Sequence, residues 1–101
     1  IIDRGLLGYN HVSVVQISMA ATADNHLNDF NKAVHEIAEI ETCMMIAGSF
    51  DYMLVVRTRD MPHFREVLGE QISKLPGIRQ TNSYAVMEVV KDTQEFRVDQ
   101  Q

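Results

Sequence analysis

The 101-residue sequence lacks several features that would assign a chain to a class at once. It has a single cysteine, Cys43, so no internal disulfide can form and a reducing cytosol is the expected compartment. Its longest apolar runs are too short to span a bilayer, and its start, IIDR, is not a basic segment followed by an apolar one. We therefore expect a cytoplasmic protein with no signal peptide and no membrane partner. Because the first residue is not methionine, we expect a fragment, a processed product or a trimmed form.

Basic charge is also scarce. The sequence has nine lysines and arginines against 14 aspartates and glutamates, a formal net charge of −5. Its basic residues are scattered, whereas nucleic-acid-binding domains gather such residues on the face that meets the phosphates. This part of the chain is therefore not expected to bind DNA or RNA itself. With 46% hydrophobic and 23% charged residues, the composition and length suit one globular domain.

Motifs for metal and phosphate binding are absent as well. The sequence contains no HExxH, no CxxC and no glycine-rich phosphate loop, and its four histidines lack the spacing of metal ligands. We predict no metal, no cofactor and no enzyme activity. Three of the histidines are predicted to be solvated residues on helices, namely His26, His35 and His63.

Two further residues could take part in catalysis or ligand contact, but each has a simpler explanation. Cys43 has no histidine placed by the sequence to activate it, so it is predicted to be a small buried hydrophobic residue. Gly69 interrupts an expected helix at a cost of about 1 kcal/mol relative to alanine. We attribute this glycine to close backbone packing rather than to ligand contact.

Hydrophobic periodicity predicts four strands and a first helix. The predicted strands are residues 11–19, 40–47, 51–58 and 78–90. The first helix is predicted over residues 25–38 and capped by Asp24. Its apolar face at helical spacing consists of Leu27, Phe30, Val34 and Ile37.

A second helix is predicted between the third and fourth strands. It starts at Asp60-Met61-Pro62, because a capping aspartate followed by proline in the first turn is a helix-start signal. It ends at LPG, residues 75–77, because proline disfavours helical geometry in the residue before it. Its buried face is predicted to comprise Phe64, Val67, Leu68, Ile72 and Leu75. In the polar tail after residue 90, Phe96 and Val98 are predicted to add a short edge strand.

The predicted order, β-α-β-β-α-β, is typical of the ferredoxin-like arrangement, an α+β fold with an antiparallel sheet and both helices on one face. The two halves show no residue-level repeat. Residues 43–47 and 53–56 are apolar at both odd and even positions, so both faces of these strands need cover. The chain has no third layer, and we predict a homodimer in which the two sheets face each other.

The turn between the second and third strands contains one carboxylate, Asp51. Glycine and aspartate are common turn formers, so Asp51 has a structural explanation, hydrogen bonding to nearby amides. Composition alone slightly favours this structural explanation, but a functional one is also available. A carboxylate beside free turn amides suits a zwitterionic amino acid, with the carboxylate taking the ammonium group. Met45, Met61 and Val86 could then house the ligand's side chain.

The sequence around this turn, and a second stretch further on, resemble a known protein family. The stretches IETCMMIAGSFDYMLVVRTRDM and LPGIRQTNSYAVMEVVK closely resemble the C-terminal effector-binding and oligomerisation (RAM) domain of the Lrp/AsnC transcriptional regulators. The likeness covers residues 6 to 92 and looks closest to the leucine-responsive branch. It implies the ferredoxin-like fold, dimers that assemble into tetramers or octamers, and an amino-acid effector such as leucine bound near dimer–dimer contacts.

The resemblance also implies site residues and domain boundaries. The implied effector-binding residues are Met45, Gly48, Ser49, Phe50, Asp51, Tyr52, Met61, Tyr84, Ala85 and Val86. Residues 1–9 would be the linker from an absent N-terminal winged helix-turn-helix domain that binds DNA, residues 10–91 the effector domain, and residues 92–101 a polar tail. One position departs from the family, because Ser49 stands where an acidic residue usually follows the glycine. This departure leaves open a weaker or different ligand.

Two other classes of function are compatible with the fold. Ferredoxin-like chains also pair into dimeric α+β barrel enzymes such as small monooxygenases, which generally need a polar or histidine-containing pocket that these apolar faces do not offer. A stand-alone regulatory domain without a DNA-binding partner is the third possibility. The absence of turnover and of a bound cofactor would separate the first of these from a regulator, and the upstream coding sequence would settle the second.

Overall fold

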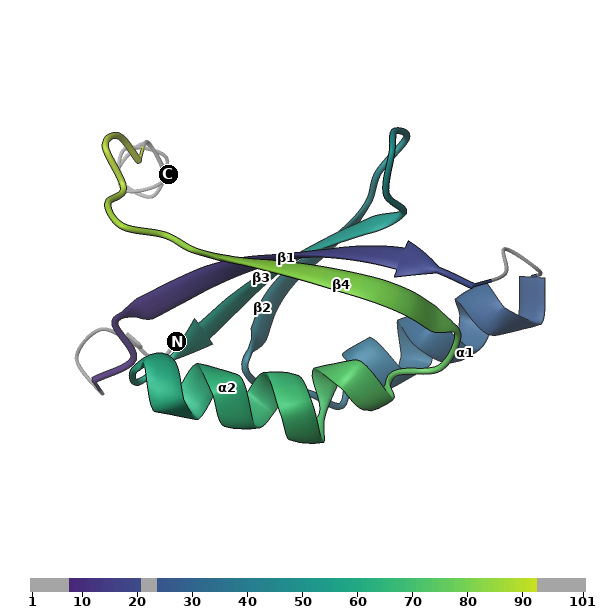
Figure 1. Ribbon diagram of the computed structural model, residues 1–101, viewed down its shortest axis with the longest axis horizontal. Coiled ribbons are helices and arrows are strands. Elements are labelled where there is room, and N and C mark those ends of the chain that lie inside the picture. The colour runs from purple at the N-terminus through teal and green to yellow at the C-terminus, as the bar shows by residue number, and fades with distance from the viewer. Residues whose placement is uncertain (1–7, 21–23, 93–101) are drawn as a thin grey trace, which may run out of the picture.

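The structure is a computed structural model that describes residues 8–20 and 24–92. Four antiparallel strands form one sheet in the order β2-β3-β1-β4, and both helices lie on the same side of it (Figure 1). Along the chain the elements are β1 (His11–Met19), α1 (Asp24–Val34), β2 (Ile40–Met45), β3 (Tyr52–Thr58), α2 (Met61–Glu70), a 3-10 turn η1 (Ile72–Lys74) and β4 (Ile78–Ala85). The predicted βαββαβ fold is confirmed.

Helix α1 is shorter than predicted. It ends at Val34 instead of residue 38, and tighter turns follow, in which the amide of His35 donates to the carbonyl of Lys32 and that of Ile37 to Val34. Ile37 is nevertheless buried with Phe30, because a tight turn keeps residues three apart on one side. The prediction of Asp24 as the cap concerns a side chain outside the described part of the structure.

Helix α2 starts as predicted. The Asp60 carboxylate accepts a hydrogen bond from the amide of His63 at 2.9 Å, and Pro62 lies in the first turn. After η1 the chain leaves the helical path at Leu75, and Gly77 has φ of 81°, a left-handed conformation that favours glycine. Gly69 was wrongly predicted to pack closely, because a Cβ atom there would meet nothing within 4 Å outside its own helix.

Three strands are shorter than predicted. β2 ends at Met45, β3 begins at Tyr52, and β4 ends at Ala85 rather than at residue 90. The last bond of β4 to its neighbour runs from the amide of Val86 to the carbonyl of Val12, at 2.9 Å. Since β1 itself starts at His11, which the register places opposite residue 87, the residues after 87 have no part of β1 beside them. The predicted edge strand at Phe96 and Val98 lies outside the described residues.

The two faces of the sheet differ in cover, and the uncovered face is apolar only in part, because Gln16 pairs there with Met53 and with Asn82. On the helix side, β1 and β3 contribute fully buried residues to the core, including Val15, Ile17 and Leu54. On the other side, Val14 pairs with Val55 of β3 and with Tyr84 of β4, and Met44 pairs with Met53. Met44 and Tyr84 are exposed on this open face. The prediction that these strands are apolar on both sides is confirmed.

Candidate functional site

The β2–β3 hairpin is anchored to the end of β1 by Asp51. The amide of Asp51 donates to the carbonyl of Ile17 at 2.9 Å, and one carboxylate oxygen, Oδ2, accepts from the amide of Met19 at 2.7 Å. The Asp51 carbonyl also accepts from the amide of Ile46 at 2.8 Å, which closes the loop. The structural explanation weighed from the sequence therefore holds for Oδ2. The second oxygen, Oδ1, has no such bond to another residue in the described part of the chain.

The hairpin loop places three of the expected site residues together. Gly48 and Ser49 are exposed and Phe50 is half-buried, and Figure 1 shows the loop projecting away from the helices. Gly48 has no positive φ, and a Cβ atom on it would make only an ordinary contact, 3.7 Å from a methyl group of Ile46. The geometry of the loop therefore does not require glycine at this position.

Four of the other expected site residues lie at the other end of β1. Tyr84 and Ala85 pair with Val14 and Ser13, whereas the hairpin contacts Ile17 and Met19. The four residue steps of strand from Ser13 to Ile17 span roughly 13 Å. Met61 starts α2, which follows the end of β3 that pairs with His11, so it belongs to the same end as Tyr84, Ala85 and Val86. One chain thus holds the expected effector residues as two separate groups.

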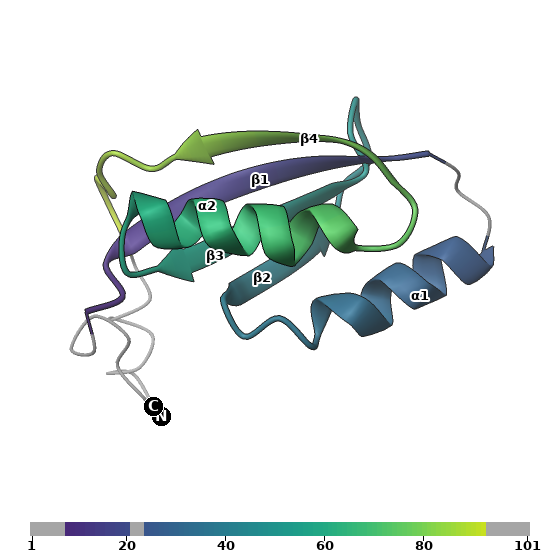
Figure 2. The same ribbon diagram turned by 60° about the horizontal axis from the view of Figure 1, so that its bottom comes forward.

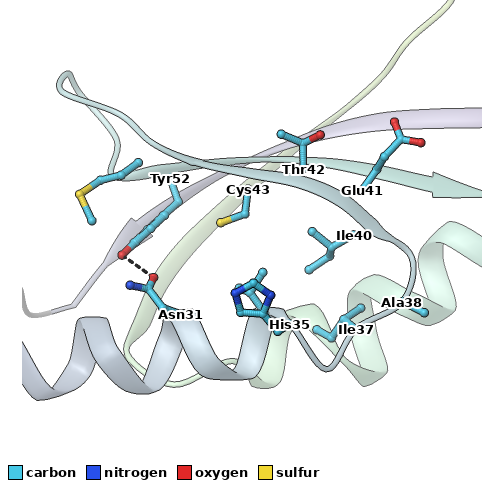
Figure 3. A pocket seen from close by; sticks show the side chains of 11 residues that line it. Asn31, His35, Ile37, Ala38, Ile40, Glu41, Thr42, Cys43 and Tyr52 are labelled. Carbon is cyan, nitrogen blue, oxygen red and sulfur yellow. Dashed lines mark hydrogen bonds between the residues drawn. The ribbon is translucent and has the colours of Figure 1, made fainter. Parts of the chain in front are cut away.

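A hollow of about 580 Å³ lies between α1 and β2 (Figure 3). Two expected site residues, Met45 and Tyr52, line it, and Met45 is 64% exposed. The other lining residues are Asn31, Val34, His35, Ile37, Ala38, Ile40, Glu41, Thr42 and Cys43. No residue pattern predicts this hollow, because it depends on how far α1 lies from the sheet.

Tyr52 of β3 lines the hollow and contacts α1. Its ring stacks on Phe30 with centroids 4.3 Å apart, and its hydroxyl donates to Oδ1 of Asn31 at 3.1 Å. Burial raises the pKa of the Tyr52 phenol, with smaller contributions from Cys43 and Asp51. Burial also raises the pKa of the Cys43 thiol. Both groups are therefore protonated at neutral pH, and Cys43 is half-buried and unactivated, close to its prediction.

The prediction for His63 was wrong. It was predicted to be solvated but is buried: Nδ1 accepts from the amide of Arg59 at 3.1 Å, and Nε2 lies 3.6 Å from a carboxylate oxygen of Glu39. Its ring also meets Tyr9 edge to face, with centroids 5.8 Å apart. The signal was available, because His63 lies four residues before Val67 and so shares the buried face of α2. His35 is exposed as predicted, and the His26 side chain lies outside the described residues.

Within residues 8–20 and 24–92, no group of three His, Cys, Asp or Glu side chains is placed to hold a metal ion. No helix in these ranges has the length and apolar character needed to cross a membrane.

The fold is that of a ligand-binding regulatory domain. The family model of the Lrp/AsnC ligand binding domain matches residues 12–96, so the chain belongs to the Lrp/AsnC family. The resemblance seen in the sequence is confirmed.

Named relatives are transcriptional regulators. The chain is 46% identical over 87 residues to the proline dehydrogenase transcriptional activator of Rhizobium radiobacter, covering 86% of this chain and 56% of that protein. It is 40% identical over 79 residues to the leucine-responsive regulatory protein of Escherichia coli K12, covering 78% of this chain and 48% of that one. The chain thus spans about half the length of these relatives.

The fold itself recurs in solved structures. A transcriptional regulator from Neisseria meningitidis, solved as an L-Met complex, superposes with a TM-score of 0.82 over 93% of this chain and 60% of that one. At 20% sequence identity, this likeness establishes the shared fold alone.

Proposed function

We propose that this domain binds an amino-acid effector and couples its binding to the assembly of a transcriptional regulator. The observation that carries the proposal is the division of the expected effector residues. Met45, residues 48–50, Asp51 and Tyr52 lie at the hairpin end of β1, and Met61 and residues 84–86 lie at the other end. A complete site therefore needs a second chain to supply the missing half.

The open face of the sheet supports a second copy as the source of that half. Val14, Val55, Met53 and Met44 make this face apolar, and apolar faces of this kind are usually covered by another subunit. If two sheets pack face to face about a two-fold axis that crosses the strands, the hairpin of each chain meets the far end of its partner's β1. A homodimer, and larger assemblies such as tetramers or octamers, follow as part of the proposal.

The segment after β4 also supports pairing. Residues 86–92 rise from the sheet on the same side as the hairpin loop (Figure 1). Met87 is 98% exposed and Val90 is 87% exposed in the single chain. Burying such side chains against another subunit is favourable by roughly 25 cal/mol for each Å² of apolar surface removed from water.

The chemistry of the hairpin suits an amino acid. Oδ1 of Asp51 can accept from the ammonium group, since Oδ2 already bonds to Met19. The exposed Met45 offers apolar surface for the ligand's side chain. With Ser49 in place of a second carboxylate, the ammonium group would rely on Asp51 alone. Leucine, methionine and proline are the ligands to test first, since relatives include a leucine-responsive regulator, a methionine complex and a proline dehydrogenase activator.

Regulation then follows from linkage. An effector that binds one assembly more tightly shifts the population toward that assembly. In the intact regulator, each subunit would have an N-terminal DNA-binding domain before a linker over residues 1–9. A change of assembly would change the distance between these domains, and so would change which operators they span. Residues 10–91 would be the effector domain and 92–101 a tail. The proposal assigns no catalytic step to this domain and places it in the cytoplasm with the DNA.

Calorimetric titration with single amino acids tests the proposal, together with sedimentation of the same samples. We expect one amino acid to bind saturably and to change the assembly. Asp51→Asn is the informative variant, because its side-chain oxygen can still accept from Met19 while the negative charge is gone. It should fold as the parent does but bind the amino acid about tenfold or more weakly. Unchanged affinity would make Asp51 purely structural, and silence across the panel would contradict an amino-acid effector.

A further inference from the structure

The chain enters the sheet at Tyr9, two residues before β1 begins, and three residues hold it there. Its carbonyl accepts from Nη1 of Arg57 at 3.3 Å, its hydroxyl accepts from Nη1 of Arg59 at 3.5 Å, and its ring meets the ring of His63 edge to face. The Arg59 guanidinium also lies 5.9 Å from the centre of the Tyr9 ring. We call Arg57, Arg59 and His63 the Tyr9 clamp. They come from the end of β3 and the start of α2, beside the start of β1 (Figures 1 and 2).

Gly8 prepares the chain for these contacts. Its φ is 85°, a left-handed conformation that favours glycine, and a Cβ atom on it would meet nothing within 4 Å. The preference for glycine therefore comes from the backbone turn and not from a lack of space. Because this turn directly precedes Tyr9, the turn and the Tyr9 clamp together set the path by which the chain reaches β1.

His63 joins the Tyr9 clamp to the first turn of α2. Its Nδ1 accepts from the amide of Arg59 at 3.1 Å, and its own amide donates to the Asp60 carboxylate at 2.9 Å. The amide of Phe64 donates to the Asp60 carbonyl at 3.0 Å. These bonds fasten the first turn to the residue before the helix, so the turn and the clamp move together.

Met61 lies in the same turn as His63, two residues earlier. Met61 is 37% exposed, whereas His63 is 7% exposed. A ligand can therefore reach Met61 from solvent, although the ring that holds Tyr9 is buried. Since Met61 is one of the expected effector residues, a ligand that contacts it acts on the turn to which the clamp is fastened.

We propose that the first turn of α2 carries the effector signal to Tyr9. An effector that displaces Met61 moves His63 with it and weakens the hold of the Tyr9 clamp, which frees the path of the chain into β1. This route acts within one chain, whereas a change of assembly acts between chains. It rests on the proposed function, because it assigns Met61 to the effector site, and the experiment below separates the two.

The tyrosines offer a direct probe of the clamp. The sequence has three tyrosines and no tryptophan, so protein labelled with 3-fluorotyrosine gives three fluorine NMR signals, and Tyr9→Phe identifies that of Tyr9. His63→Gln retains a side-chain acceptor for the Arg59 amide but removes the ring. It should move the Tyr9 signal toward that of free fluorotyrosine. His35→Gln is the matched control, because His35 is exposed, and it should leave the signal in place.

The link from Met61 to Tyr9 is tested first without a ligand. Met61→Gly loosens the first turn, because glycine adds backbone freedom to a helix, and it should shift the Tyr9 signal. In a His63→Gln background the same change should shift the signal much less. Glu66→Gly is the matched control, because Glu66 is exposed on the same helix beyond its first turn, and it should leave the signal in place.

The ligand arm uses leucine, methionine and proline, added singly to protein that also carries carbon-13 in its methionine methyl groups. The Met61 methyl signal, identified with Met61→Leu, reports contact with the amino acid, and the Tyr9 fluorine signal reports the clamp. In the parent, one amino acid should shift both signals. In His63→Gln the Met61 signal should still shift, while the Tyr9 signal should no longer respond.

Two results would overturn the proposal. One is a Tyr9 signal that stays fixed in His63→Gln or in Met61→Gly. The other is a Tyr9 signal that stays fixed while an amino acid shifts the Met61 signal, a result that leaves the proposed function intact. If none of the three amino acids shifts the Met61 signal, the proposed function fails at this residue, and the Met61→Gly comparison alone decides whether the turn is linked to Tyr9.

Discussion

The two helices of this domain are seated differently on the same sheet. Helix α2 has a defined cap at Asp60 and packs His63, Phe64 and Val67 against β1 and β3. Helix α1 is held chiefly through Phe30 and Val34 and leaves a hollow beside β2. Helix α2 is thus packed tightly on the sheet, whereas α1 leaves space beside β2. Figure 2 shows the contrast, with α2 across the sheet and α1 along its edge.

Removing the main anchor of α1 should have the largest effect. Phe30 is fully buried and stacks on Tyr52, so Phe30→Ala leaves a cavity and should lower the free energy of unfolding by about 3–5 kcal/mol. Urea denaturation followed by circular dichroism measures the change. Lys32→Ala, on the exposed side of the same helix, should stay within about 0.5 kcal/mol of the parent. A small loss for Phe30→Ala would show that α1 contributes little to the core.

Removing the cap of α2 should cost less. Asp60→Ala deletes the acceptor for the His63 amide and should lower the free energy of unfolding by about 1 kcal/mol. Asp60→Asn keeps a side-chain oxygen at the cap and is the control that should recover most of the loss. If both variants lost the same amount, the charge of Asp60 rather than its hydrogen bond would matter.

Tyr52 joins α1 to the sheet and should give a smaller effect that depends on pH. Tyr52→Phe loses the bond to Asn31 and should lower the free energy of unfolding by about 0.5–1.5 kcal/mol at neutral pH. Because the pKa of Tyr52 is raised above its usual 10.0, the folded state favours the neutral phenol. Its contribution is therefore complete below pH 10 and is lost as pH rises through the folded-state value.

The alkaline comparison should be made between Tyr52→Phe and the parent. The parent should lose stability above pH 10 more steeply than Tyr52→Phe, which has no phenol to ionise at that position. Cys43, whose pKa is raised by burial above 9.0, adds a loss of the same sign in both proteins. Parallel curves for the two proteins would contradict the burial of the phenol.

The smallest expected effect is a gain in α2. Gly69→Ala places a methyl group where nothing lies within 4 Å outside the helix, so it should raise the free energy of unfolding by about 0.5–1 kcal/mol. Thermal and urea denaturation both measure this. A loss of stability in the assembled protein would mean that another chain packs against Gly69.

The fold was predictable because each element carries a local signal. The β-branched run at 11–19 and the Asp60-Met61-Pro62 start needed no tertiary information. Helix and strand ends were less predictable, because residues 88–90 keep a strand-like sequence but run beyond the start of β1. The prediction for His63 was wrong because histidine is usually a surface residue, whereas the spacing of four residues from Val67 puts His63 on the buried face of α2.

The candidate site was predictable only in part. The hairpin residues were found by resemblance. Asp51 does have a structural bond, but its donor is the amide of Met19 on β1 rather than an amide of its own turn. The separation of Met61 from the hairpin depends on strand register, which no single motif encodes. The hollow beside β2 depends on the distance between α1 and the sheet, and residue patterns contain no information about that distance.

The bond between the Met19 amide and Asp51 makes one proton a reporter for the hairpin. Met19 is buried, and its amide can exchange with solvent deuterium only when the hairpin detaches from β1. A ligand that draws the Asp51 carboxylate away should speed this exchange, and one that uses only Oδ1 should slow it. The rate at a single backbone position thus measures how tightly the loop is fastened, and it does so without any change in overall shape.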